Sequence, residues 1–154
     1  MMRAILLSFI ISVTLSACLN EPQLPPLTND YSLNDRIPLS LLEEASISQE
    51  NIHIAFAEVK EESRCPIAWQ CLWEGEAEVE LTVKKGDFIE KIRLKYDGGN
   101  CTECGNTATA FGYKIKLEQL SPFPDETFYA QKPLDFNTYK IVITVINDND
   151  KIYL

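Results

Sequence analysis

Residues 76–85 read EAEVELTVKK, and this stretch decides the fold class. Apolar residues occupy every second position and charged or polar residues lie between them, the apolar set being Ala77, Val79, Leu81 and Val83. This period of two predicts a β-strand with one face in a core and the other in solvent. Lys85-Gly86-Asp87 has the composition of a turn, and a second strand is expected at residues 88–96 (FIEKIRLKY), where apolar and basic residues alternate from position 91 to position 96. We therefore predict a hairpin whose acidic and basic outer faces make cross-strand charge contacts.

Further strands are expected on both sides of this hairpin, at residues 52–59, 112–120 and 139–146, with weaker edge strands at 37–42 and 151–154. Residues 139–146 (YKIVITVI) are apolar on both faces, which favours a central position in a sheet. Residues 41–48 have no apolar stripe of helical period, so no helix is expected there. Short strands separated by Gly, Pro and Asn turns predict an all-β domain over residues 37–154. Of barrel and sandwich, we favour an antiparallel β-sandwich of about seven strands.

The N-terminus has the layout of an export signal: Arg3, then the apolar residues 4–15, then small residues. The apolar run is shorter than the ~20 residues that a membrane-spanning helix needs. Leu15-Ser16-Ala17-Cys18 resembles the lipobox of bacterial lipoproteins; the alternative is a plain secretory signal with a chance cysteine. The resemblance implies that residues 1–17 are removed, that Cys18 carries acyl chains such as palmitate, and that the protein is lipid-anchored at the cell envelope. Leu19 in place of aspartate favours the outer membrane if the cell has two.

Composition limits the partners of the mature chain. Residues 18–36 contain several prolines and no sustained periodicity, which is typical of an extended tether. The chain carries 14 Lys and Arg against 23 Asp and Glu, a formal net charge of −9. Loss of Arg3 with the signal makes the mature chain one unit more acidic. Nucleic acid and anionic lipid headgroups are therefore unsuitable partners, whereas the N-terminal lipid would itself engage the membrane.

Four cysteines remain besides Cys18. An even number in an exported chain argues for two disulfides, and spacing favours Cys65–Cys71 and Cys101–Cys104. A zinc site of four thiolates is the alternative, although five residues between Cys65 and Cys71 exceed the usual ligand spacing. A thioredoxin-like role for Cys101 and Cys104 is weaker, because glycine-rich sequence flanks them instead of a βαβ unit. No metal or cofactor is expected on the favoured reading.

Residues 63–77 (SRCPIAWQCLWEGEA) resemble a pattern, S-R-C-P-x4-C-x-W-x-G-x-A, of small uncharacterised lipoproteins and exported proteins of bacteria. Residues 117–124 (LEQLSPFP) resemble a second segment of the same group. The resemblance implies a β-sandwich-like domain in which Cys65 and Cys71 are bridged, and it implies no enzyme activity. Cys101 and Cys104 lie outside the shared pattern.

The residues of this motif allow a structural and a functional interpretation. Trp73 can pack against the bridge, Gly75 can permit a bulge before the next strand, and Arg64 can pair with neighbouring glutamates. Alternatively, Arg64, Trp69 and Trp73 are recognition residues, because Arg and Trp dominate interface hot spots.

The sequence lacks the residue patterns of common catalytic sites. His53 is the only histidine, and no nucleophile elbow, P-loop, dinucleotide fingerprint or HExxH motif is present. Residues 147–150 (NDND) are better explained as a turn than as a calcium site. We therefore expect a non-catalytic envelope module that binds or supports an envelope protein. The alternatives are an inhibitor of a secreted hydrolase, a protease or lysozyme, acting through the Cys65–Cys71 loop, and a four-cysteine zinc domain.

Overall fold

The predicted hairpin forms one side of the molecule. Strands β4 (Ala77–Lys85) and β5 (Phe88–Tyr96) pair along their whole length, with Lys85 opposite Phe88. Gly86 adopts a positive φ of 58° in the turn between them. The expected charge contacts are present: Lys91 Nζ lies 2.8 Å from Glu80 Oε1, and Lys95 Nζ lies 2.6 Å from Glu76 Oε1. The hairpin prediction is confirmed in its turn and charge pairing, and its strand bounds agree to within one residue.

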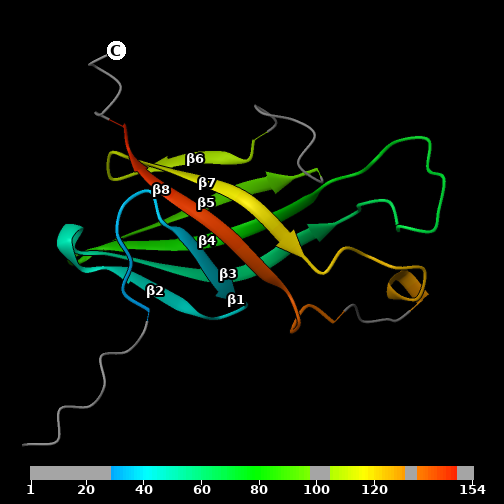
Figure 1. Ribbon diagram of the computed structural model, residues 1–154, viewed down its shortest axis with the longest axis horizontal. Helices are drawn as coiled ribbons and strands as arrows, with labels where there is room; N and C mark the ends of the chain where they lie inside the picture. Colours follow the sequence, from blue (N-terminus) through cyan, green and yellow to red (C-terminus); the bar gives the residue numbers. More distant parts are fainter. Residues whose placement is uncertain (1–28, 98–104, 131–134, 149–154) are drawn as a thin grey trace, which may run out of the picture.

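The computed structural model describes residues 29–97, 105–130 and 135–148, and within these ranges eight strands form two four-stranded antiparallel sheets (Figure 1). One sheet has the order β2-β3-β4-β5, in which β2 is Glu44–Ile47 and β3 is Ile52–Glu62. The other has the order β1-β8-β7-β6, made of Arg36–Ser40, Lys140–Asn147, Tyr113–Ser121 and Thr107–Ala110. Two short 3-10 turns, η1 (Ser48–Glu50) and η2 (Phe128–Ala130), lie in the connections between strands. The all-β sandwich prediction is confirmed.

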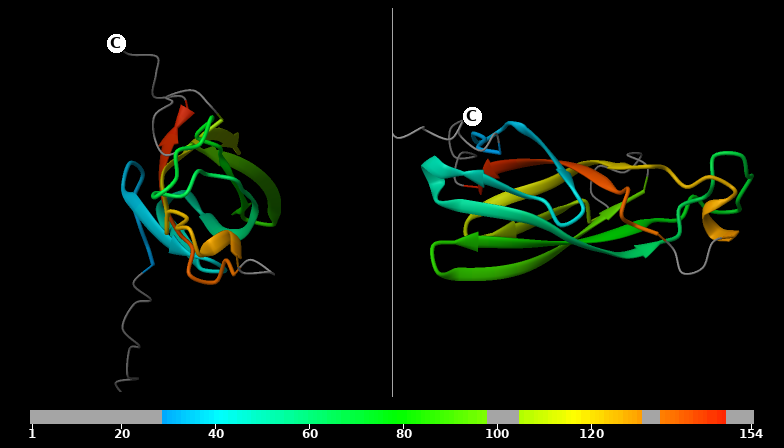
Figure 2. Two further views of the ribbon diagram at one scale, coloured as in Figure 1. Left: turned by 90° about the vertical axis from the view of Figure 1, so that its right-hand side faces the viewer. Right: turned by 90° about the horizontal axis from the view of Figure 1, so that it is seen from below.

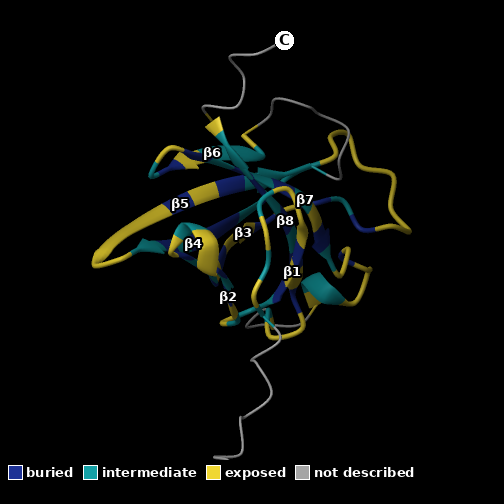
Figure 3. Cartoon of the chain, turned by 60° about the vertical axis from the view of Figure 1, so that its left-hand side comes forward, coloured by how far each residue is buried: buried dark blue, intermediate teal, exposed yellow. Residues whose placement is uncertain are grey.

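The core lies between the two sheets and is built from the inward half of each alternating strand (Figure 3). Strand β8 lies between β1 and β7, so the central position expected for residues 139–146 is confirmed. Its inward residues Ile141, Ile143 and Val145 are at most 1% exposed, and the residues between them are half-buried. Strand β1 is at the edge of its sheet, as expected for the weaker candidate at 37–42.

Two short strands were not expected from the sequence. β2 lies inside residues 41–48, and β6 has the sequence TATA. Each has four residues, which is too few for an alternation to be recognised, and each is defined by its pairing with a longer neighbour. The strand predicted at 151–154 lies outside the described residues, as do residues 149 and 150 of the predicted C-terminal turn.

Part of the predicted tether packs on the domain. Tyr31 N donates to Ser46 O at 2.8 Å, and Asn34 N donates to Val145 O at 2.9 Å. Tyr31 and Leu33 also pack against the core. Residues 29–36 therefore belong to the sandwich, because their backbone and apolar side chains find partners on both sheets.

The domain is elongated, and its two ends differ (Figure 2). The first described residues pair beside Ser46, at the end of the sandwich that holds Ile52 and Lys85. The loop between β3 and β4 projects from the other end, beyond Glu62 and Ala77 (Figure 1). The 11 residues of β3 separate the two ends by roughly 35 Å. The described ranges contain no helix that is both long and apolar enough to cross a membrane.

Candidate functional site

The projecting loop, residues 65–75, is called the tip below, and it is held by an extension of the β3–β4 ladder. Ser63 N donates to Glu76 O at 2.9 Å, and Cys65 N donates to Glu74 O at 2.8 Å. Gly75 lies between these pairs with a φ of 69°. A Cβ at this position would lie 1.9 Å from Ser63 O, so only glycine permits the close approach of the two chains.

A disulfide closes the tip. Cys65 and Cys71 are bonded with an S–S distance of 2.08 Å, which confirms the pairing favoured by spacing. Trp69 N donates to Pro66 O at 2.9 Å inside the ring, and Ile67 N donates to Pro124 O at 3.2 Å below it. This disulfide excludes the alternative of a zinc site with four cysteine ligands, because Cys65 and Cys71 are bonded to each other and supply no thiolate. Cys18, Cys101 and Cys104 lie outside the described residues.

Arg64 supports the tip from below and is fully buried, its side chain being 0% exposed. Its guanidinium forms an ion pair with Glu62 through both Nε and Nη2. It also donates to two backbone carbonyls, Leu120 O at 3.2 Å and Pro122 O at 3.0 Å. Its Cζ lies 4.7 Å from the centroid of the Phe123 ring, a cation–π contact. One arginine thus joins β3 to the end of β7 and the chain that follows it.

Two tyrosines complete this cluster. Tyr139 Oη donates to Glu62 Oε2 at 2.8 Å, and Tyr129 Oη donates to Arg64 O at 2.7 Å. Burial raises the pKa of Tyr139, and its hydrogen bond to the Glu62 carboxylate raises that pKa further. Burial lowers the pKa of Arg64, but hydrogen bonds and the charge of Glu62 more than offset this, so the net pKa is raised. Arg64 therefore stays charged although it is buried.

The cluster brings together the two segments that carried the resemblance. Arg64 comes from the first segment, and Leu120, Pro122 and Phe123 come from the second. This placement corrects the expectation that Arg64 is a recognition residue: a guanidinium with no exposed surface is not available to a partner. Arg64 instead fixes the loop that presents the neighbouring aromatic residues.

Exposed apolar side chains gather on the tip. The exposed fractions are 75% for Ile67, 53% for Trp69, 96% for Leu72 and 73% for Trp73. Trp73 therefore does not bury a large apolar area against the disulfide, as its structural interpretation expected. Both tryptophans of the chain instead face solvent at one end of the molecule.

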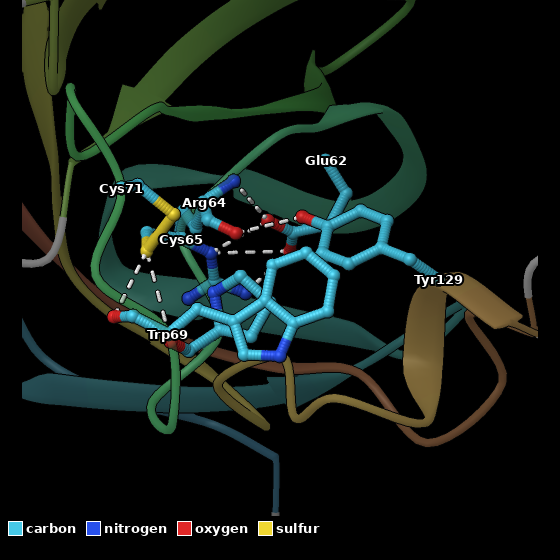
Figure 4. Close-up of a disulfide and its surroundings, with 7 residues drawn as sticks. Glu62, Arg64, Cys65, Trp69, Cys71 and Tyr129 are labelled. Carbon is cyan, nitrogen blue, oxygen red and sulfur yellow. Dashed lines mark hydrogen bonds and ion pairs between the residues drawn. A yellow bond between two sulfur atoms is a disulfide. The ribbon is translucent and has the colours of Figure 1, made fainter.

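A hollow of about 480 Å³ lies beside the disulfide. It is lined by Trp69, Trp73 and Tyr129, by the two bridged cysteines, and by Glu62, Ser63, Arg64, Pro66, Gln70 and Leu72. Figure 4 shows the Trp69 indole and the Tyr129 ring near the disulfide and the Arg64–Glu62 pair. The sequence drew attention to Trp69, to the disulfide and to pairing of Arg64 with a neighbouring glutamate, which the Arg64–Glu62 ion pair confirms, but it missed the burial of that pair and both Tyr129 and Tyr139. β3 has two register shifts, one after Phe56 and one after Val59. The alternation of inward and outward residues therefore cannot be extended along the sequence to Glu62, so its inward position was not predicted.

A second hollow lies at the opposite end of the sandwich. It has a volume of about 320 Å³ and is lined by Asn29, Glu44, Ala45, Ser46 and His53. His53 Nδ1 lies 3.2 Å from Glu44 Oε1, and the side chain is 45% exposed. In the described part of the chain, no group of three or more His, Cys, Asp or Glu side chains is arranged to hold a metal ion.

Comparisons of this chain with protein-family models, with curated proteins and with solved structures find no match.

Proposed function

We propose that this protein is a lipid-anchored, non-catalytic binding module of the bacterial cell envelope that contacts an envelope protein through its tip. The observation that carries the proposal is the gathering of Ile67, Trp69, Leu72 and Trp73 in exposed positions on one rigid loop. Exposed apolar groups that adjoin one another are the usual mark of an interaction surface, and tryptophan is the residue most enriched in interface hot spots.

The contacts that hold the tip in one shape support the proposal that its exposed apolar residues bind a partner. The disulfide, the Arg64–Glu62 pair and the Tyr129 hydrogen bond hold the loop in one shape before any partner arrives. A loop ordered in advance loses little conformational entropy on binding, so more of the contact free energy appears as affinity. The resemblance of residues 1–18 to an export signal with a lipobox supports a location outside the cytoplasm, where disulfides are stable.

The described domain begins at the end of the sandwich opposite the tip. Residues 19–28 between Cys18 and the described domain span at most about 40 Å when extended. The domain begins at the end that holds Ser46, roughly 35 Å from the tip along β3. Several acyl chains on Cys18 would hold this end at the membrane, the outer membrane if the cell has two, and the tip would reach away from that membrane.

Site-specific photo-crosslinking tests the binding surface. A benzoylphenylalanine replacing Leu72 is expected to give a discrete adduct with an envelope protein in cells that make this protein. The matched control replaces Leu42, which is 77% exposed outside the tip, and is expected to give none. Equal adducts from both positions, or none from Leu72, would contradict the proposal.

The mass of the protein extracted from membranes tests the anchor separately. The expected mass is that of a chain beginning at Cys18 plus acyl chains, and Cys18→Ser is expected to release the protein from the membrane fraction. A chain that begins elsewhere without lipid would contradict the lipoprotein assignment and leave the binding surface to be judged by the crosslink.

Inhibition of a secreted hydrolase is the second candidate function. A protruding loop closed by a disulfide and supported from below favours it, because such a loop can occupy an enzyme cleft without loss of order. The expected result is stoichiometric inhibition of a basic protease or lysozyme that Trp69→Ala abolishes. Unchanged enzyme activity at saturating protein would leave the binding module as the only proposal.

A further inference from the structure

The hollow at the tip has aromatic walls. Trp69, Trp73 and Tyr129 line it together with the disulfide, and the Tyr129 ring is held in place because its hydroxyl donates to Arg64 O at 2.7 Å. Aromatic faces are electron-rich and attract a cation within about 6 Å of the ring centroid, tryptophan most strongly. A hollow of this kind can therefore distinguish a cation from a neutral group of the same shape.

The exposed charged side chains in the described segments beside the hollow are acidic. In residues 61–76 and 121–130 the only cationic side chain is Arg64, which is 0% exposed and paired with Glu62. The exposed charged residues of these segments are all acidic, namely Glu61, Glu74, Asp125 and Glu126. Lys95, on the neighbouring strand β5, donates to Glu76 at 2.6 Å, so its charge is compensated. The surroundings therefore favour a positive ligand and oppose phosphates and anionic headgroups.

The apolar rim indicates a cation carried on a protein. Leu72 lines the hollow and is 96% exposed, and Ile67, in the same loop, is 75% exposed. A small free ammonium ion would leave both exposed to water, whereas a protein surface with a basic side chain among apolar neighbours would cover them.

We propose that the hollow between Trp69, Trp73 and Tyr129 binds a lysine or arginine side chain of the protein partner. This inference rests on the proposed function, since it names the chemistry that the tip recognises. The alkyl stem of the basic side chain contacts the aromatic walls, and its charge is attracted by the ring faces and the surrounding carboxylates.

Matched peptides test the inference on the full chain in a neutral polyoxyethylene detergent. The probes are acetyl-Leu-Lys-Leu-amide and acetyl-Leu-norleucine-Leu-amide, which differ in the charged amine alone. The chain has two tryptophans, both on the tip, so its two indole N–H resonances report on this site specifically. We expect both resonances to shift, with the lysine peptide binding about three- to tenfold more tightly at low salt.

Variants assign the effect to the hollow. Trp69→Ala and Trp73→Ala are each expected to remove the preference for lysine, with one indole resonance left in each variant as the reporter. Phe88→Ala, at a position 73% exposed on the hairpin turn, is expected to retain the preference. The three replaced side chains are all exposed, so we expect the backbone amide resonances of each variant to show an unchanged fold.

Equal affinity for the two peptides, stronger binding of a glutamate peptide, or no shift with any of them would overturn the inference. The crosslink at Leu72 separates this failure from failure of the proposed function. A crosslink without a preference for lysine means that the tip binds a partner by its apolar groups alone. Loss of both results means that the tip is not the binding surface.

Discussion

Arg64 is the single residue on which the shape of the tip depends most. Removing it would leave the Glu62 carboxylate buried without its cation, and two backbone carbonyls would lose a donor. Breaking one side of a buried ion pair typically costs about 3–5 kcal/mol. We therefore expect Arg64→Met to lower the free energy of unfolding by that amount, measured by urea denaturation.

The same cluster provides a graded control. Tyr139→Phe removes one hydrogen bond and leaves the ion pair in place, so about 1–2 kcal/mol should be lost. Adding Glu62→Gln to Arg64→Met should restore part of the stability, since the isolated charge is then gone. A loss from Arg64→Met no larger than that from Tyr139→Phe would show that the ion pair does not support the fold.

Gly75 and Gly112 form a matched pair for testing how closely the tip strands approach. Both have a positive φ, 69° and 80°, but an added Cβ would meet Ser63 O at Gly75 and nothing within 4 Å at Gly112. Gly112→Ala should therefore cost about 1 kcal/mol from the backbone conformation alone, and Gly75→Ala at least about 3 kcal/mol. Thermal unfolding followed by circular dichroism measures both. Equal losses would mean that the clash at Gly75 is relieved cheaply.

Among the elements, the disulfide ring matters more for the shape of the tip than for global stability. The two cysteines are separated by six positions, and so small a ring stabilises by only about 2 kcal/mol. The double variant Cys65→Ser/Cys71→Ser should therefore remain folded while the Leu72 crosslink and the preference for the lysine peptide are lost. Unfolding of this variant, or retention of both activities, would show that the ring has a different role.

We expect the protein to lose stability in acid because of the Glu80–Lys91 pair in the β4–β5 hairpin. A hydrogen bond from Lys91 holds the pKa of Glu80 below its usual range, against a smaller opposing effect of burial. The folded protein then binds fewer protons than the unfolded chain, so this contribution is complete above about pH 4.3 and is lost as the pH falls through the folded pKa. Glu80→Gln and Lys91→Met should each make the decline between pH 5 and pH 3 shallower in urea titrations. A decline as steep as that of the wild type would contradict this assignment.

How far an element could be predicted depended on its length and regularity. β4 alternates throughout and β5 alternates from Lys91 onward, and the sequence predicted the turn, the charge contacts and the strand bounds to within one residue. β2 and β6 are too short for a recognisable period, and the register shifts of β3 concealed the inward position of Glu62. The disulfide followed from spacing. The burial of Arg64 could not be predicted, because its partners Leu120 and Pro122 are distant in sequence and approach only in the folded sandwich. The same holds for Tyr139, which donates to the Glu62 carboxylate of the ion pair.

At the scale of the whole molecule, an elongated sandwich separates the end where the described chain begins from the apolar tip (Figures 1 and 2). The buried cluster beneath the tip connects the two sheets at the end that we propose as the binding end. The tip combines exposed tryptophan with surrounding carboxylates, so we expect its partner to be basic and apolar at the contact.

Hydroxyl-radical footprinting of the protein in intact envelopes and after purification tests the central claim most directly. Trp69, Leu72 and Trp73 should be oxidised readily in the purified protein and protected in the envelope. Phe88 and Ile89, which are 73% and 65% exposed on the hairpin turn, should be oxidised equally in both. Equal oxidation of the tip in both states, or protection confined to the hairpin turn, would contradict the proposal that the tip is the binding surface.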